Sequence, residues 1–332
     1  MDKIKFGIIG CGRIAQRHAG HMANFGELVS LYDVKQDRAR ELSSSFQGDV
    51  YSTLEDFMNS EMDVVAVCSP NGLHAEHTIQ ALRAGHHVIC EKPMAISSKD
   101  CAEMIQVAEQ AARKLFVVKQ NRYNPAIAVL KEKIDHGDLG KIYSVQLNCF
   151  WNRNFDYYSK SDWKGTKNLD GGTLFTQFSH FIDLLYWMVG DIQDMHGMKA
   201  NFAHGEVIDF EDTGVLSLKF VNGALGTINY SVNSFAKNME GSITFFGEKG
   251  TVKIGGQYLN KLEYQSWEGD EIGELPPGNP ANQYGEYQGS MSNHDKVYQN
   301  VIDVLQNNGN IATTGEEGMA VVSLIERMYK TM

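Results

Sequence analysis

A glycine turn between an apolar run and an expected helix constrains this sequence more than any other feature. Residues 4–9 (IKFGII) are apolar and β-branched, as a buried parallel strand requires, and Gly10, Gly12 and Ala15 follow with G-x-G-x-x-A spacing. The first glycine permits a tight turn, the second lets a pyrophosphate approach the backbone, and the small third residue lets the helix pack on the strand. The helix expected over residues 13–25 would present free N–H groups to an anion at its first turn. The pattern predicts a dinucleotide-binding βαβ unit.

An acidic residue follows at the distance that such a unit needs. The second apolar run, LVSLYD, ends at Asp33, about 20 residues after Gly12, where a carboxylate hydrogen-bonds the adenosine ribose. An acid at this position disfavours a 2′-phosphate, so NAD is predicted in preference to NADP. The alternative is that Asp33 is only a turn or capping residue before VKQD.

The alternation of strand and helix continues through the first third of the chain. Strands are expected at residues 62–70, 86–93 and 114–121, with a helix at about 97–112, which together predict a doubly wound parallel sheet. Ligands of such sheets lie beyond the carboxyl ends of the strands. The residues at or next to these ends are the predicted cofactor ligands: Gly10, Gly12, Arg13, Ile14, Asp33, Ser69, Asn71, His74, Glu91, Lys92 and Asn121.

Lys92 is the predicted catalytic residue of this region. It ends a strand and precedes Pro93, whose ring keeps the preceding residue extended. A partly buried lysine can donate to a substrate hydroxyl, and burial lowers its pKa toward useful proton transfer. The alternative is a solvated surface charge. His74 and His77 have i, i+3 spacing, but no third ligand is apparent and no metal is predicted.

The sequence changes character after residue 122. A helix is expected to end near residue 136, and residues 141–151 then alternate as a strand of an antiparallel sheet does. Asn222-Gly223 and residues 248–250 each separate two apolar runs and predict hairpins. We expect an α/β protein with a Rossmann domain over 1–122 and an α+β domain over 123–332. The second domain is built on a large, mainly antiparallel open sheet, whose free face predicts a homodimer or homotetramer.

Residues 151–167 form a positive island in an acidic protein. The chain has 30 lysines and arginines against 41 acids, a net charge of −11, which disfavours nucleic acid and anionic membranes as partners. The island has four cations, two acids and five aromatic residues, which can stack on a ligand and bind its carboxylate or phosphate. The alternative is an exposed loop whose aromatic rings pack on the sheet.

An apolar helix is expected over 169–190, beginning at Gly171-Gly172. Thr176, His180 and Asp183 would share one face of it, where polar groups need partners that a substrate cleft would supply. A hydrogen-bonded core histidine is the alternative. Lys92 and His180 are the predicted catalytic pair. The predicted substrate ligands are Arg122, Arg153, Tyr157, Tyr158, Trp163, Lys164, Thr176, Gln177 and His180.

A proline- and glycine-rich tract, residues 276–294, is expected to be a loop that either caps the site or is a plain surface connection. Its polar candidates are Tyr284, Tyr287, Ser290, Asn293 and His294. Five scattered cysteines without CxxC spacing favour a reducing compartment, and no targeting segment or long apolar run is apparent. A cytoplasmic protein is expected.

Together these motifs resemble the Gfo/Idh/MocA family over nearly the whole chain. The landmarks are GIIGCGRIA, SPNGLHAEH, EKP at 91–93, NRYNP at 121–125 and GGTLFTQFSHFIDLLYWMVG. The resemblance implies hydride transfer between a nicotinamide and a sugar carbinol, with Lys92 and His180 at the family's acid/base positions. Many members have an aspartate where this chain has Thr176, so an Asp-His relay is not implied, and Asp183 either orients His180 or is structural.

WNRNFDYYSKSDWKGT and the segment after it are similar to one branch, the UDP-N-acetylglucosaminuronate 3-dehydrogenases. That branch implies NAD-dependent oxidation of the C3 hydroxyl of a UDP-N-acetyl-aminosugar uronate (UDP-GlcNAcA) for surface polysaccharide (O-antigen and lipopolysaccharide) synthesis. In some members 2-oxoglutarate reoxidises the bound NADH. The alternatives are a free-sugar or inositol dehydrogenase of the same family, and a non-catalytic regulatory protein that binds NAD or sugar.

Overall fold

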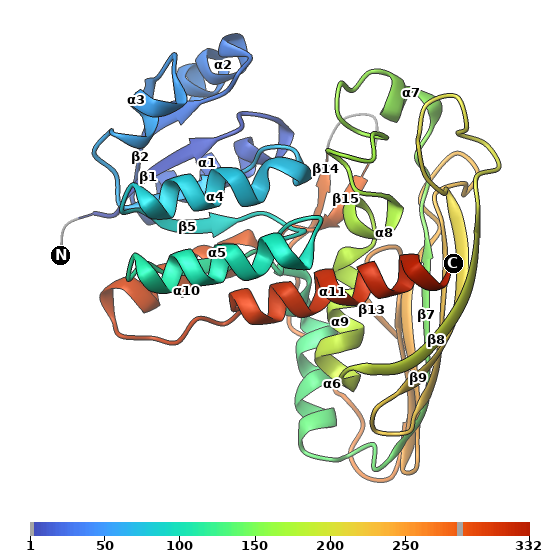
Figure 1. Cartoon of the computed structure of the whole chain (residues 1–332). Helices are drawn as coiled ribbons and strands as arrows, with labels where there is room; N and C mark the ends of the chain where they lie inside the picture. The colour runs from blue at the N-terminus through green and yellow to red at the C-terminus, as the bar shows by residue number, and fades with distance from the viewer. Residues whose placement is uncertain (1–2, 284–287) are drawn as a thin grey trace. The chain divides into compact units, whose positions relative to one another are not determined.

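The computed structural model describes residues 3–283 and 288–332, which divide into two compact units (Figure 1). The first unit is Met1–Lys119 with His294–Ser323, and the second is Gln120–Asn293 with Leu324–Met332. The end of the first stretch at Lys119 is close to the expected domain boundary after residue 122. The return of His294–Ser323 to the first unit was not predicted, because a helical pattern does not reveal which sheet the helix covers.

The first unit is built on a six-stranded sheet with the order β3-β2-β1-β4-β5-β6, and each of its paired strands is parallel. This is the strand order of dinucleotide-binding folds. The strands are β1 Lys5–Ile9, β2 Glu27–Tyr32, β3 Asp49–Val50, β4 Val64–Val67, β5 His87–Cys90 and β6 Leu115–Val117. The predicted doubly wound sheet is therefore confirmed, with the short β3 as an addition.

Every residue of β4 is buried, as in a strand that lies between two layers of helices. Helices therefore cover both faces of the sheet. The helices are α1 Arg13–Phe25, α2 Gln36–Phe46, α3 Leu54–Met58, α4 His74–Arg83, α5 Ser98–Gln110 and α10 His294–Gln306, with the 3-10 turn η1 Asn71–Leu73. The side chain of Ser97 caps α5 by accepting the Asp100 N–H. Helix α10 packs against α1, although the two are far apart in the sequence.

The second unit is built on a seven-stranded sheet with the order β13-β12-β11-β7-β10-β9-β8. All pairs are antiparallel except β10 with β7, so the predicted mainly antiparallel sheet is confirmed. The turns at Asn222-Gly223 and at residues 248–250 join antiparallel partners as expected. The strands are β7 Ile142–Phe150, β8 Ile192–Ala200, β9 Thr213–Phe220, β10 Leu225–Ser231, β11 Glu240–Gly247, β12 Gly250–Gly255 and β13 Lys261–Trp267.

One face of this sheet is buried, as the alternation of buried and exposed residues along β9 shows. Figure 1 shows α6 and α9 on the same side of the sheet. The helical segments are η2 Gln120–Tyr123, α6 Pro125–Asp135, α7 Phe155–Ser159, α8 Thr173–Thr176 and α9 Ser179–Val189. The last helix, α11 Gly315–Thr331, begins in the first unit and ends in the second.

The helix expected over residues 169–190 is wrong in one respect, because it is interrupted between α8 and α9. At the interruption the Phe178 ring enters an aromatic core against Trp151, Phe181 and Tyr230. Burial of this ring stabilises the irregular turn. Thr176 and His180 therefore stand on different helices, and the expected single polar row does not form.

The tract over residues 276–294 is not a plain loop. It contains a two-stranded sheet, β14 Ala281–Gln283 with β15 Gln288–Met291, and Tyr284 and Tyr287 lie outside the described residues. Among the described helices, none is both long and apolar enough to span a bilayer.

Candidate active site

The turn after β1 has the geometry of a phosphate cradle. Gly10 has a φ of +88°, and a Cβ there would lie 2.6 Å from the backbone nitrogen of Ser69, so this close crossing requires glycine. A Cβ on Gly12 would meet no atom within 4 Å. The first turn of α1 begins beside this open space with its free N–H groups. The turn thus leaves room for a pyrophosphate, next to Arg13 and Ile14 in the first turn of α1.

Asp33 is fixed at the end of β2 by two backbone donors. Its Oδ2 accepts the Cys11 N–H at 2.8 Å and its Oδ1 accepts the Lys35 N–H at 2.7 Å. Each carboxylate oxygen keeps a further lone pair for a ribose hydroxyl. Burial and the Asp33 charge raise the pKa of the Cys11 thiol to about 12, so this cysteine is no nucleophile near neutral pH.

His74 holds two strand ends together. One ring nitrogen lies 2.7 Å from the Pro93 carbonyl oxygen and the other 2.8 Å from the Ser69 carbonyl oxygen. Both ring nitrogens therefore face backbone carbonyl oxygens, and a neutral imidazole donates to only one of the two. Ser69 also uses its Oγ for His77 Nδ1, at 2.9 Å, and Asn71 is buried at the start of η1.

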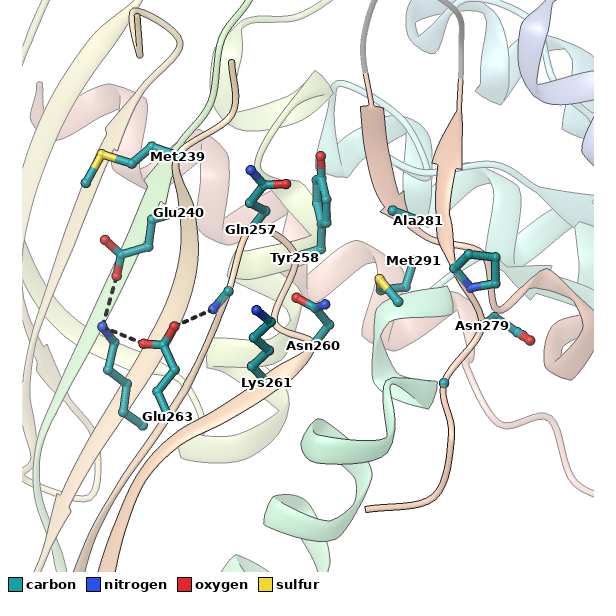
Figure 2. Close-up of a pocket in the computed structure, with 14 residues that line it drawn as sticks. Met239, Glu240, Gln257, Tyr258, Asn260, Lys261, Glu263, Asn279, Ala281 and Met291 are labelled. Carbon is teal, nitrogen blue, oxygen red and sulfur yellow. Dashed lines mark hydrogen bonds and ion pairs between the residues drawn. The ribbon is translucent and has the colours of Figure 1, made fainter. Parts of the chain in front are cut away.

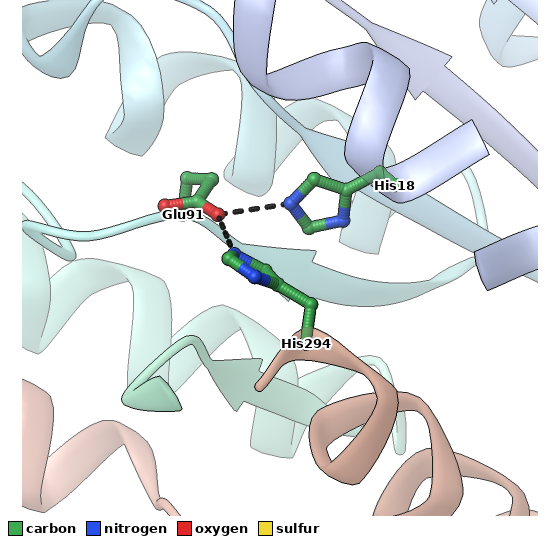
Figure 3. A group of neighbouring side chains, drawn as sticks. All are labelled: His18, Glu91 and His294. Carbon is green, nitrogen blue, oxygen red and sulfur yellow. Dashed lines mark hydrogen bonds and ion pairs between the residues drawn. The ribbon is translucent and has the colours of Figure 1, made fainter. Parts of the chain in front are cut away.

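Glu91, Lys92 and Pro93 follow β5. Lys92 is half-buried, and its N–H donates to Glu91 Oε2 at 3.0 Å. The Lys92-Pro93 peptide bond is cis. The Glu91 carboxylate, predicted as a cofactor ligand, is buried and points to His18 and His294 (Figure 3). Its contacts are internal to the first unit.

The second unit contains a buried carboxamide at Asn121. Asn121, in η2, is buried, and neither polar atom of its side chain has a hydrogen-bond partner among the residues that the structure describes. An unpartnered buried amide is costly, so a ligand that accepts and donates at Asn121 would relieve it. This observation fits the predicted cofactor role of Asn121.

His180 lies near the start of α9 and is buried. Its Nε2 is 3.4 Å from Ser290 Oγ on β15, and Gln120 Nε2 approaches the same oxygen at 3.5 Å. Ser290, expected only as a member of a capping tract, thus contacts the predicted catalytic histidine directly. Asn293 of the same tract donates to the Gln120 carbonyl at 3.3 Å.

Arg122 is held by Asp183 in a buried bidentate ion pair. Its Nε and Nη2 donate to the two carboxylate oxygens at 2.9 and 2.8 Å, and its guanidinium lies over the Trp187 ring. Of the two roles open for Asp183, this contact supports the structural one. The substrate role of Arg122 stays a prediction.

Residues of the positive island and Gln177, which lies between α8 and α9, come together around Tyr157. The Lys164 Nζ lies 3.7 Å from the centre of its ring and the Arg153 guanidinium carbon lies 5.2 Å from it. Gln177 joins them, because it accepts from Arg153 Nε at 2.7 Å and donates to the Tyr157 hydroxyl at 2.9 Å. Four predicted substrate residues therefore form one cluster in the second unit.

Two further residues of the positive island, Tyr158 and Trp163, differ in how deeply they are buried. Tyr158 is buried against Tyr157 and His204, and its hydroxyl has no partner in the described part of the chain. It packs as a core residue, which the alternative interpretation of the island predicted. Trp163 is half-buried, with Lys164 5.9 Å from its ring.

Thr176 is paired with an acid that sequence reasoning missed. Its hydroxyl contacts Asp170 Oδ1 and also donates to the Asp170 carbonyl at 3.0 Å. Burial raises the pKa of Asp170 to about 6, against hydrogen bonds from Thr176 and backbone N–H groups that favour the charged form. The signal was available, since Asp170 directly precedes the double glycine.

A polar pocket of about 820 Å³ lies in the second unit (Figure 2). In it Lys253 bridges Glu240 and Glu263 at 3.2 and 2.9 Å. Tyr258 on its wall accepts at its hydroxyl from Asn238, whose oxygen accepts from Arg153. None of the predicted site residues lines this pocket, but it adjoins the Arg153 cluster through these bonds.

Comparison with known proteins assigns both halves to one family. The NAD-binding Rossmann fold of the Gfo/Idh/MocA oxidoreductases matches residues 4–119, and the C-terminal alpha/beta domain of the same family matches residues 131–332. A myo-inositol 2-dehydrogenase of Thermotoga maritima is 28% identical over 75% of this chain and 74% of its own. A glucose-6-phosphate 3-dehydrogenase of Bacillus subtilis is 32% identical, but the match spans only 55% of this chain and 53% of that protein.

Two crystal structures resemble the whole chain. Both are WlbA dehydrogenases in complex with NADH and UDP-GlcNAcA, each 34% identical to this chain with a TM-score of 0.89. The one from Bordetella pertussis covers 99% of this chain and 96% of its own, and the one from Chromobacterium violaceum 100% and 94%. From its motifs, its two folds and these matches, the chain belongs to the Gfo/Idh/MocA family of NAD-dependent sugar oxidoreductases.

Proposed function

We propose that this protein oxidises the C3 hydroxyl of a UDP-N-acetyl-aminosugar uronate such as UDP-GlcNAcA to a 3-keto sugar in surface-polysaccharide synthesis. The observation that carries the proposal is the cluster of Arg153, Lys164, Gln177 and Tyr157. It gathers two cations and an aromatic ring near the helix of His180, which suits a uronate carboxylate or a diphosphate. The similarity to two UDP-GlcNAcA-bound dehydrogenases over the full chain supports it.

The residues of this chain would supply binding and proton transfer. When bound, NAD supplies the oxidant for the sugar carbinol. The cradle at Gly12 and the Asp33 carboxylate would hold its pyrophosphate and its ribose. The hydroxyl needs a positioned base, for which Lys92 and His180 are the proposed candidates. Ser290 would orient the His180 ring through the 3.4 Å contact with Nε2.

Substrate assays separate this proposal from its main alternative. UDP-GlcNAcA, myo-inositol and glucose 6-phosphate are each mixed with enzyme and NAD, and NADH absorbance is followed over many turnovers. A parallel series contains 2-oxoglutarate, in case NADH stays bound and is recycled by that acceptor. Efficient oxidation of the free polyol or the sugar phosphate, without oxidation of the UDP-uronate, would assign a free-sugar or inositol dehydrogenase instead.

Two substitutions test the catalytic pair and exclude a non-catalytic regulator. Lys92→Met is expected to abolish turnover while NADH still binds, measured by fluorescence titration. His180→Asn is expected to shift the pH–rate profile, because it removes one candidate base. Unchanged turnover in Lys92→Met would remove that lysine from the mechanism, and no turnover of any sugar by the parent would favour the regulator.

We also propose that the outer face of the seven-stranded sheet binds a second copy of the chain, giving a homodimer or homotetramer. Met198, Val215, Leu225 and Phe246 are exposed there and share one side of paired strands. Met198 is paired with Val215, and Leu225 and Phe246 flank Ser144 of β7, so these side chains lie in two rows of one face, where an apolar patch favours an interaction surface. Light scattering of the parent and of Val215→Glu is expected to show a smaller species for the variant. A monomeric parent would contradict this.

A further inference from the structure

A buried carboxylate directly precedes Lys92. Glu91 directly follows β5 in the interior of the first unit, where its Oε1 lies 2.9 Å from His18 Nε2 of α1 and 3.3 Å from His294 Nε2 of α10 (Figure 3). All three side chains are almost fully buried. They come from three distant parts of the sequence, so only the fold brings them together.

The positions of the protons follow from the charge of Glu91. Burial alone would raise the pKa of Glu91, but the hydrogen bonds from His18 and His294 outweigh burial and hold it well below its usual range. An ionised carboxylate only accepts, so both histidines donate through Nε2. Burial lowers the pKa of His18, which is therefore neutral, and its Nδ1 accepts the Tyr298 hydroxyl at 2.7 Å.

The second oxygen of the carboxylate reaches the lysine. Glu91 Oε2 accepts the Lys92 N–H at 3.0 Å, and the carbonyl of the next residue, Pro93, is bound by His74. The backbone around Lys92 is thus fixed on both sides by buried groups. Loss of either histidine from Glu91 would leave a buried charge under-solvated and free the oxygen to rotate away from the Lys92 N–H.

We propose that His18 and His294 are positioning residues for Lys92, acting through the carboxylate of Glu91. This inference rests on the proposed function, in which Lys92 is a catalytic residue. A displacement of about 1 Å in such a group can cost on the order of 100-fold in rate, so the network need only hold a backbone in place to matter.

The same short segment also supports the other proposed catalytic residue. Ser290 contacts His180 in the second unit, and His294, four positions later, contacts Glu91 in the first. His294 is the first residue of the stretch that returns to the first unit. His294 lies outside every sequence motif of the cofactor site, yet a substitution there would change the contact with Glu91, which holds the Lys92 backbone.

The three ligand atoms lie within 4.8 Å of one another, which would also suit a divalent metal ion. Hydrogen bonding accounts for the group more fully. The two N···O distances are hydrogen-bond distances, both Nε2–H groups have an anionic acceptor, and the Tyr298 hydroxyl has its acceptor in His18. Metal binding is therefore an outcome that the experiment must detect.

The test compares two substitutions at one site. His294→Leu removes the donor, and His294→Gln keeps an N–H near the position of Nε2. We expect His294→Leu to lower kcat by about 10- to 100-fold, with the sugar KM and the NADH Kd within about two-fold of the parent. His294→Gln should recover most of this loss. Equal kcat values in the parent and His294→Leu would overturn the proposal, as would equal losses in both variants.

His86→Leu is the matched control. His86 is a buried histidine of the same unit whose ring nitrogens lie 2.9 and 2.8 Å from the Met62 and Met58 carbonyl oxygens. It precedes β5, whereas Lys92 lies beyond the carboxyl end of that strand. His86→Leu should lower the melting temperature about as much as His294→Leu and leave kcat unchanged. A fall of kcat in proportion to lost stability in both variants would show a merely structural role and overturn the proposal.

Two readouts are independent of turnover. Nitrogen NMR of the parent near neutral pH should show His18 as the neutral Nε2–H tautomer, since burial lowers its pKa from the ordinary value. An Nδ1–H tautomer would overturn the assigned network. One equivalent of zinc in the purified protein, lost in His294→Leu, would overturn it in favour of a metal site.

The inference and the proposed function can fail separately. If Lys92→Met turns over as fast as the parent, the role proposed for Lys92 fails and the inference fails with it. If Lys92→Met is inactive while His294→Leu keeps the parent kcat, the proposed function stands and only the positioning role is overturned.

Discussion

The buried pair of Arg122 and Asp183 offers the sharpest stability prediction. Asp183→Asn keeps the shape of the side chain but removes the charge that faces the guanidinium. The two side chains are 4% and 2% exposed, and both carboxylate oxygens accept from the arginine. The variant leaves the cation buried and places an amide NH₂ against one of its N–H donors. The change therefore breaks a charge pair that water cannot replace.

The magnitude follows from this burial. Breaking a buried ion pair by removal of one partner costs about 3–5 kcal/mol of unfolding free energy. The second unit has roughly 180 residues, and at that size each kcal/mol lowers the melting temperature by about 2–4 °C. We expect the transition of this unit to fall by about 6–20 °C. Replacing both partners with apolar residues, Arg122→Met with Asp183→Leu, should recover much of the loss.

Urea unfolding and scanning calorimetry measure the effect, and a surface pair provides the control. Lys131 and Asp135 are paired in α6, but the Asp135 side chain is 57% exposed. Asp135→Asn should cost less than about 0.5 kcal/mol. A loss in Asp183→Asn no larger than in this control would refute the argument. A normal stability with a reduced kcat would instead show that Asp183 orients His180.

Three further predictions concern the cofactor turn and one buried acid. Gly12→Ala should weaken NADH binding by about ten-fold or more and leave stability within about 1 kcal/mol. Gly10→Ala, with its φ of +88° and a Cβ 2.6 Å from the Ser69 nitrogen, should instead destabilise the fold by about 1–3 kcal/mol. Fluorescence titration and urea unfolding separate the two, and equal effects would contradict the cradle. Asp33→Ser should raise NADPH affinity relative to NADH by about ten-fold, in paired titrations, since it removes the acid that repels a 2′-phosphate; an unchanged ratio would leave Asp33 a turn residue. Burial raises the pKa of Asp170 from 3.8 to about 6, so between these pH values the folded chain binds more protons than the unfolded chain. The free energy of unfolding should therefore fall as pH rises from about 4 to 6, by roughly 3 kcal/mol relative to Asp170→Asn. A difference between the two proteins that is flat from pH 4 to 6 would contradict this.

The elements of this protein were largely predictable because their signals are local. Strands were predicted from apolar runs that either alternate with polar residues or are uninterrupted, and a hairpin was predicted from the Asn222-Gly223 turn. The glycine turn and Asp33 lie within one βαβ unit, so their spacing along the chain already fixes their neighbourhood. The fold class and NAD followed from these signals, the family followed from the resemblance of the longer motifs, and all three are confirmed.

The partners of buried polar groups were not predictable from spacing. The prediction that Thr176, His180 and Asp183 share one face of a single helix was wrong, because the helix is interrupted at Phe178, whose ring is buried in the aromatic core. The pattern of polar residues along the chain does not reveal this interruption. Asp183 then pairs with Arg122, sixty-one residues away. Such pairs form because an unpaired buried charge is costly, and this desolvation cost arises only once the core has formed.

The sequence by itself determined the Rossmann turn, the acid that follows its second strand, the mainly antiparallel second sheet and the residue types predicted for a sugar site. The tertiary structure alone decided which of those residues meet. It brought Arg153 and Tyr157 onto Gln177 and Lys164 onto the Tyr157 ring, and it returned His294 to the carboxylate beside Lys92. The physical reason is that periodicity encodes which face of an element is buried, whereas the pairing of charges depends on which buried faces come together.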